Sequence, residues 1–164
     1  MGDEDGGGDE GREREVKRPL VVALLLSLTI PSAATANDIC NGQSRPDCAK
    51  AVAFFDEFQH ALAVNDRERV ASMARYPLRM LLHGKSALIR NRAELLREYD
   101  TVFDSSVLCA IQRAKRTDVW GNWQGFTVAG GPAWWEREDD NSPFKLITVN
   151  NGAYYKGCGN PKNR

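Results

Sequence analysis

Few side chains in this sequence have the type and spacing that catalysis or metal binding requires. The two histidines, His60 and His83, stand at no metal-ligand spacing to the cysteines, and no Cys-x-x-Cys pair occurs. Nucleophile elbows and phosphate-binding loops are also absent from the sequence. His60 falls late in an expected helix and His83 in an expected turn, so a surface role is weighed against a catalytic one for each. We expect neither a metal nor a cofactor.

Asp104 and Asp118 are two acidic residues that could in principle serve as catalytic acids. Asp104 is better explained as a helix cap and Asp118 as a residue at a strand edge. The pair Asp139-Asp140 lies in a polar loop, where solvation is a better explanation than calcium binding. The carboxylates therefore do not assemble into a recognisable acid–base pattern.

The four cysteines, Cys40, Cys48, Cys109 and Cys158, indicate two disulfides, because an even number in an exported chain is typical of a covalent framework. Three pairings are open. We favour Cys40–Cys48, a local loop ahead of the first helix, and Cys109–Cys158, which would join a helix to the C-terminal tail. A metal site and a catalytic cysteine are the rival interpretations.

Residues 1–36 have the features of an N-terminal extension and an export signal. Lys17-Arg18 precede an apolar run from Pro19 to Ile30, and Ala34-Thr35-Ala36 follows as a cleavage motif. The alternative is a membrane anchor, but the run is about a dozen residues long, short of the roughly 20 that span a bilayer. We expect cleavage after Ala36, a periplasmic or secreted protein without a stable membrane anchor, and a single domain over 37–164.

Residues 1–15 are acidic and glycine-rich, whereas the start of an export signal should be basic. Val16 stands directly before the basic pair, and a valine codon can initiate translation in bacteria. We therefore hypothesise that 1–15 result from a misassigned start and that translation begins at position 16. The intact mass of the unprocessed precursor tests this hypothesis, and a precursor that begins at Met1 contradicts it.

The charge of the mature part excludes one class of partner. Residues 37–164 carry 18 Lys and Arg against 15 Asp and Glu, because 4 of the 22 basic and 7 of the 22 acidic residues precede them. This mild balance, without a long basic run, argues against nucleic-acid binding.

Hydrophobic periodicity predicts helices first and strands afterwards. Helices are expected over 47–65, 66–74, 91–103 and 106–114, with Asp47, Asn91 and Asp104 as N-caps. Strands are expected over 78–82, 86–89, 117–120, 124–129, 133–138 and 144–150, with turns at Gly121-Asn122 and Gly130–Pro132. This order predicts an α+β fold in which helices pack on one face of a curved antiparallel sheet.

The adjacent tryptophans Trp134 and Trp135 must face opposite sides of their strand, because side chains alternate along a strand. We expect one of them in the core or a pocket and assign the outward position, as a candidate interface residue, to Trp135. On the last strand the same alternation places Phe144, Leu146 and Thr148 on one face and Lys145, Ile147 and Val149 on the other.

The order of elements resembles the nuclear transport factor 2-like superfamily, also called cystatin-like cones, which includes ketosteroid isomerase, scytalone dehydratase and exported bacterial members. The resemblance covers most of residues 48–151. It is carried by Phe54-Phe55-x-x-Phe58, Tyr76-Pro77-Leu78, Leu95-Leu96-x-x-Tyr99, Phe103, Trp123-Gln-Gly125, Gly131-x-x-Trp134-Trp135 and Ile147-Thr-Val-Asn-Asn151. A likeness of architecture transfers little function.

The resemblance implies a conical pocket between the sheet and a helix. Plain core packing is the competing interpretation for each aromatic residue in it. The candidate ligand-binding residues are Tyr76, Met80, Tyr99, Phe103, Trp123, Phe126 and Trp134.

Three functions follow as hypotheses. The first is an exported non-catalytic domain that binds a small apolar ligand or an envelope protein in or beside the pocket. The second is a small isomerase- or dehydratase-like enzyme that uses Tyr76 or Tyr99 with a buried carboxylate. The third is an inhibitor or immunity-type protein that presents Trp135 or the loop 139–143. A homodimer formed through the sheet is compatible with these hypotheses.

Overall fold

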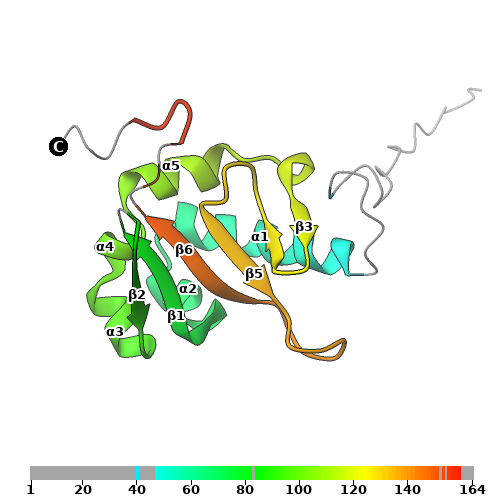
Figure 1. Cartoon of the computed structure of the whole chain (residues 1–164), viewed down its shortest axis with the longest axis horizontal. Helices are drawn as coiled ribbons and strands as arrows, with labels where there is room; N and C mark the ends of the chain where they lie inside the picture. The colour runs from blue at the N-terminus through cyan, green and yellow to red at the C-terminus, as the bar shows by residue number, and fades with distance from the viewer. Residues whose placement is uncertain (1–39, 41–46, 83, 152, 154, 160–164) are drawn as a thin grey trace, which may run out of the picture. The chain divides into compact units, whose positions relative to one another are not determined.

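The computed structural model describes Cys40 and residues 47–82, 84–151, 153 and 155–159, which all belong to one structural unit. The elements follow one another along the chain as Figure 1 shows. They are α1 (Cys48–Ala63), α2 (Arg67–Met73), β1 (Ala74–Leu82), β2 (Lys85–Ile89), α3 (Arg92–Arg97), α4 (Tyr99–Val102), α5 (Ser105–Arg113), the 3₁₀ helix η1 (Arg116–Asp118), β3 (Trp120–Asn122), β4 (Gly125–Thr127), β5 (Ala133–Glu136) and β6 (Lys145–Asn151).

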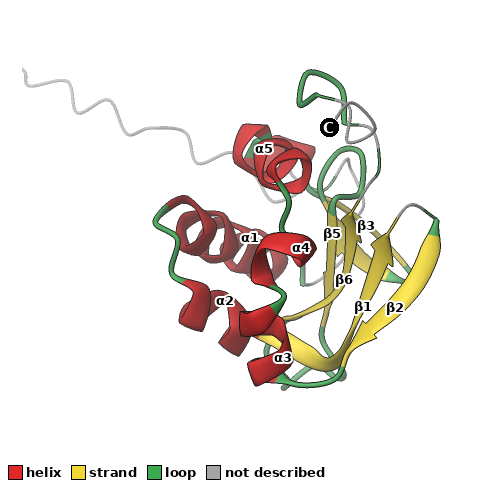
Figure 2. Ribbon diagram, turned by 90° about the vertical axis from the view of Figure 1, so that its left-hand side faces the viewer, coloured by secondary structure: helices red, strands yellow, loops and turns green. Residues whose placement is uncertain are grey.

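The strands form one open sheet in the order β2-β1-β6-β5-β4-β3 within the described part of the chain. The helices α1 to α5 all lie on one side of it, and the other side carries none of the described helices (Figure 2). The prediction of an α+β fold is confirmed. The sheet is mixed rather than wholly antiparallel, because β1 runs parallel to β6 while the other neighbours pair antiparallel.

Helix α1 covers the centre of the sheet with an aromatic face. Phe54 and Phe55 stack on the indole of Trp135, each with 5.8 Å between ring centroids. Phe58, one turn further on, contacts the ring of Phe103, which follows α4. Rings stacked in this way bury large apolar areas and add directional attraction between them. The core therefore lies between α1 and the inner face of the sheet.

Trp135 is 0% exposed, so its assignment to an outward interface is corrected. The hydrogen-bond register gives the physical reason, because Trp135 pairs with Leu146 on one side and Phe126 on the other, and both are buried. Side chains directly opposite in a sheet share a face. The outward tryptophan of the pair is Trp134, which is half-buried.

A bulge in β6 changes the expected faces of that strand. Trp134 pairs with Thr148 and Trp135 with Leu146, so Ile147 is an extra residue on β6. A residue inserted in this way resets the alternation of side chains. Leu146 and Val149 therefore face the helices, whereas Ile147 and Thr148 both lie on the helix-free face, which differs from the strict alternation expected for this strand.

The N-caps predicted at Asn91 and Asp104 are confirmed, Asp66 caps α2 in the same way, and Asp47 has a different role. The carboxylate or amide oxygens of Asp66, Asn91 and Asp104 accept hydrogen bonds from backbone N–H groups of the first turns of α2, α3 and α5. Asp47 precedes α1 but makes no such bond. Its carboxylate instead lies 3.3 Å from the guanidinium of Arg137, which is also mostly buried. Asp47 therefore ties α1 to the end of β5.

The start of the meander differs from the prediction. Residues 116–118 form the 3₁₀ helix η1, and the predicted turn Gly121-Asn122 lies inside β3. A Cβ on Gly121 would lie 2.8 Å from the ring carbons of Phe126, so this glycine makes room for a core ring rather than for a turn. The turn falls instead on Trp123-Gln124, between the paired Asn122 and Gly125.

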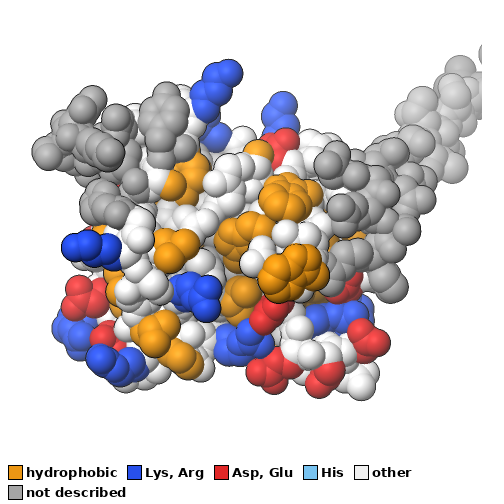
Figure 3. All heavy atoms as spheres, viewed as in Figure 1, with side chains coloured by type: hydrophobic (Ala, Val, Ile, Leu, Met, Phe, Trp, Pro, Cys, Tyr) orange, Lys and Arg blue, Asp and Glu red, His pale blue; other side chains and the backbone are white. Residues whose placement is uncertain are grey.

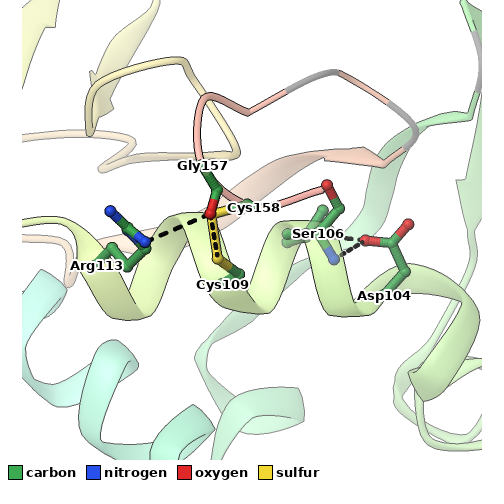
Figure 4. The surroundings of a disulfide bond; sticks show 7 residues. Asp104, Ser106, Cys109, Arg113, Gly157 and Cys158 are labelled. Atoms are coloured by element: carbon green, nitrogen blue, oxygen red, sulfur yellow. Dashed lines mark hydrogen bonds between the residues drawn. A yellow bond between two sulfur atoms is a disulfide. The ribbon is translucent and has the colours of Figure 1, made fainter. Parts of the chain in front are cut away.

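Both favoured disulfides are present. Cys40 pairs with Cys48 at the start of α1, and Cys109 of α5 pairs with Cys158 of the C-terminal tail (Figure 4). Next to the second bridge, the Arg113 guanidinium donates a hydrogen bond of 3.4 Å to the carbonyl of Gly157. Tyr155 of the same tail is buried and donates from its hydroxyl to the carbonyl of Asn150, 2.5 Å away. The tail is thus fastened to both α5 and β6.

The predicted export signal, its cleavage site and the hypothetical start at Val16 lie outside the described residues. Among the residues that are described, no helix has the length and apolar character to cross a bilayer.

The opposite placement of the two tryptophans can be tested by comparing two variants. We expect Trp135→Ala to lower the free energy of unfolding by roughly 3–5 kcal/mol, because it removes a stacked ring from the core. Trp134→Ala should cost only about 1–2 kcal/mol, because its ring is partly solvated already. Urea unfolding at neutral pH measures both values. Equal losses, or a larger loss for Trp134→Ala, would contradict the assigned faces.

Candidate functional site

The structure divides the seven predicted pocket residues between the core and the helix-free face of the sheet. Met80, Tyr99, Phe103 and Phe126 are buried in the core between helices and sheet. Tyr76 is half-buried and donates a 2.9 Å hydrogen bond from its hydroxyl to the carbonyl of Ala71. These five side chains therefore belong to the core or pack against it. Trp123 and Trp134 line a different cavity on the opposite face.

That cavity is an open groove of about 570 Å³ on the helix-free face. Strand β1 contributes every second residue to it, namely Arg75, Pro77, Arg79 and Leu81, while Leu78 and Met80 point into the core. This period of two is what the pleat of a strand produces. Figure 3 shows this face, where hydrophobic side chains gather with basic and acidic side chains among them.

One row of paired residues crosses the whole sheet on this face. From β2 to β3 the register joins Leu88 to Arg79, Arg79 to Thr148, Thr148 to Trp134, Trp134 to Thr127 and Thr127 to Trp120. Residues joined in this way share a face. The row therefore begins with an apolar side chain, continues with a cation and ends with two indoles.

The two indoles at the end of the row contact each other. Trp120 and Trp134 meet edge to face, with 5.4 Å between centroids. Thr127, which stands between them in the row, is fully buried, and its hydroxyl donates to the carbonyl of Ala133 at 2.6 Å. The Trp134 ring is thus held on the wall of the groove.

Two of the three large hydrophobic side chains that are most exposed in the described structure line this groove. Trp123 is 87% exposed and Leu88 is 53% exposed, while the third, Val64, lies at the end of α1. The two-residue turn after β3 carries the Trp123 indole at one end of the groove, and the edge strand β2 carries Leu88 at the other. Exposed apolar groups gathered on one surface are typical of an interaction site.

The two arginines of the groove differ in their partners. Arg75 forms ion pairs with Glu136 and, at 3.4 Å, with Glu138. Arg79 is exposed, and its side chain has no ion pair or hydrogen bond to any other residue that the structure describes. An unpaired guanidinium offers a planar set of donors to a carboxylate or phosphate. Arg79 is therefore the groove's available cation.

The residues considered for catalysis have structural roles. Asp104 caps α5 by accepting from the N–H groups of Ser106 and Val107, both at 2.9 Å, and Asp118 accepts from the N–H of Lys115 at 2.8 Å. His60 is exposed on α1, and His83 lies outside the described residues. Within the ranges that the structure describes, no group of three His, Cys, Asp or Glu side chains could hold a metal ion.

Of the two tyrosines in the enzyme hypothesis, Tyr99 has the more strongly raised pKa. Burial raises its pKa from 10 to about 12, which outweighs the lowering effect of the Arg67 guanidinium over its ring. Its hydroxyl has no hydrogen-bond partner among the described residues. Neither Tyr76 nor Tyr99 lines the groove.

Sequence reasoning missed most of the groove, because Arg79, Leu81, Leu88 and Ile147 were not among the candidates. A signal was present for β1, where residues 75, 77, 79 and 81 alternate with apolar residues at 78 and 80. No such local signal identifies Leu88 or Ile147, which reach the groove through strand pairing and a bulge.

The fold and the groove define the chain as an α+β domain with an open groove, lined by tryptophan and arginine, on the helix-free face of its sheet. Comparison with protein-family models, with curated proteins and with solved structures found no match. The class of domain therefore stands on the geometry alone.

The burial of Tyr99 predicts a pH dependence of stability. The unfolded chain ionises this phenol near pH 10, whereas the folded protein does so only near pH 12. The contribution of the neutral Tyr99 phenol to the free energy of unfolding is therefore fully present below pH 10 and is lost as the pH rises from 10 to 12. Between pH 10 and 12, the free energy of unfolding of Tyr99→Phe should fall by roughly 1–2 kcal/mol less than that of the unaltered protein.

Urea unfolding at pH 8.5, 10.5 and 11.5 measures this difference. At pH 8.5 the variant should be about as stable as the unaltered protein, because no described group bonds to the hydroxyl that is removed. Parallel losses of stability in both proteins above pH 10 would show that Tyr99 ionises normally in the folded state.

Proposed function

We propose that this chain is an exported, non-catalytic binding domain of nuclear transport factor 2-like architecture, and that its binding surface is the helix-free face of the sheet. The order of elements supports the architecture, since two helices, a hairpin, further helices and a meander follow one another as the resemblance implies. The binding site proposed here lies on the helix-free face of the sheet, whereas the resemblance implies a pocket between the sheet and a helix.

Export is supported by two observations of different kinds. The sequence 17–36 has the basic, apolar and small-residue segments of a cleavable signal. Disulfides persist in oxidising compartments, and both cysteine pairs of the chain are joined. We propose a periplasmic or secreted protein that is cleaved after Ala36.

The observation that carries the binding function is the gathering on one groove of exposed Trp123, exposed Leu88 and Arg79, whose guanidinium has no partner among the described residues. Exposed apolar groups are not needed for the packing of the core, which is complete on the other side of the sheet. A groove that combines apolar walls with a few polar groups is the usual form of a binding site. The enzyme hypothesis has less support, because the groove contains neither candidate tyrosine.

An anionic aromatic probe tests the proposed surface. We expect the disulfide-bonded protein to bind 8-anilinonaphthalene-1-sulfonate saturably, with a rise in probe fluorescence. Trp123→Ala should weaken this binding about five- to tenfold, because it removes one aromatic wall of the groove. Fluorescence titration gives the dissociation constants.

Val64→Ala is the matched control, because it truncates another exposed hydrophobic side chain that lies at the C-terminal end of α1 rather than on the groove. It should leave probe binding unchanged. Binding that is absent, or that responds equally to the two substitutions, would contradict the helix-free face as the binding surface.

A further inference from the structure

The groove runs across the strands rather than along one of them. Its exposed ends are Leu88 on β2 and Trp123 after β3, with β1, β6 and β5 contributing residues between them. Neighbouring strands lie about 4.8 Å apart. The turn that carries Trp123 leads into β4, and the four steps from β2 to β4 span about 19 Å. An occupant that uses both ends must be about that long.

The face of a sheet imposes a second condition on the occupant. The backbone N–H and C=O groups of β1, β6, β5 and β4 are directed toward neighbouring strands, so a segment lying across them cannot join the sheet as a further strand. The hydrogen bonds of its backbone N–H and C=O groups must be made within the segment itself, and it must contact the groove through side chains. An α-helix does so, and a length of 19 Å corresponds to about 13 residues.

The charges supply the third condition. The groove is lined by the titratable residues Arg75, Arg79 and Glu136, and Glu136 is engaged by Arg75. Glu138 also pairs with Arg75, so within the described part of the chain Arg79 remains as the groove charge without an ionic partner. It lies between Leu88 and Thr148 in the row across the sheet. A carboxylate flanked by apolar side chains complements this arrangement.

We infer that the groove binds an amphipathic helix of a partner protein, about 13 residues long, that carries an Asp or Glu within its apolar face. The carboxylate pairs with Arg79, one end of the apolar face covers Leu88 and Leu81, and the other end contacts Trp134 and Trp123. This inference rests on the proposed function, because it names the partner of the same surface.

A second copy of this chain fits the groove less well. Its corresponding face is a sheet with the same titratable groove residues, Arg75, Arg79 and Glu136, so contact between the two faces would bring together two surfaces that each carry one excess positive charge. Like charges brought together at an interface reduce affinity. The acidic helix removes this repulsion and satisfies the guanidinium.

A pair of designed peptides tests the inference on the full chain with both disulfides formed. Each is a 14-residue amphipathic helix with leucines at helical spacing, labelled with fluorescein, and the two differ only by Glu or Gln at one position of the apolar face. We expect the Glu peptide to bind about fivefold more tightly at low salt, and the advantage to decrease as salt is added. Fluorescence anisotropy measures both affinities.

Two variants of the protein assign that difference to a residue. Arg79→Gln should make the two peptides bind equally, whereas Lys85→Gln, which removes an exposed cation from β2 outside the groove, should leave the fivefold difference intact. Thermal melting checks that Arg79→Gln is folded, as expected for an exposed side chain. Equal binding of both peptides to the unaltered protein, or an unchanged difference in Arg79→Gln, overturns the inference.

The outcomes separate this inference from the proposed function. If both peptides bind equally and Trp123→Ala weakens both, the surface is a binding site but the acidic helix is not its ligand. If Trp123→Ala changes the affinity of neither the peptides nor the fluorescent probe, the proposed function itself is contradicted. A dimer in sedimentation experiments that Trp123→Ala dissociates would show that a second copy occupies the face, which also overturns the inference.

Discussion

Stacking of Trp135 against Phe54 and Phe55 determines which side of the sheet becomes the inside. Because Trp135 pairs with Leu146 and Phe126, burying its indole beneath α1 also turns those two side chains inward. The adjacent Trp134 is then forced outward, together with Thr148 opposite to it. A slip of one residue in register would exchange the two faces, so the core and the groove depend on the same aromatic contact.

The bulge at Ile147 lets one short strand serve both faces. With strict alternation, the strand from Leu146 to Asn151 would turn Val149 away from the core if Leu146 faced it. The extra residue allows Leu146 and Val149 both to pack inward, where each is fully buried. It also places Ile147 beside Thr148 on the groove. An apolar wall of the groove is therefore a consequence of how β6 completes the core.

Apart from the Cys109–Cys158 bridge, whose cysteines are 49 residues apart, the features that the sequence predicted well depend on short-range contacts. Asn91 and Asp104 cap their helices through bonds to N–H groups two or three residues away, and the local bridge Cys40–Cys48 closes a short loop. The direction of the Trp134-Trp135 pair could not be predicted in the same way, because both residues are large and apolar. It is decided by pairing with Leu146, more than ten residues further along the chain.

The same difference between local and distant contacts explains the errors around the groove. Gly121 was interpreted as a turn residue, but its lack of a side chain accommodates the ring of Phe126 on the neighbouring strand. Strand β1 was predicted to begin at Leu78, which left Arg75 and Pro77 outside it and concealed the full alternation. The cone residues were inferred from a resemblance of architecture, which gives no information on how deeply each side chain is buried.

Register also decides the charge that the groove presents. Arg75 and Arg79 stand four residues apart on β1 and point to the same face, yet only Arg75 lies near carboxylates. The residues beside Arg79 on the neighbouring strands are Leu88 and Thr148, neither of which can neutralise a guanidinium. The pairing that places Trp135 in the core therefore also leaves Arg79 without an acidic neighbour among the residues that the structure describes. In this way the packing of the inner face sets the chemistry that the outer face can recognise.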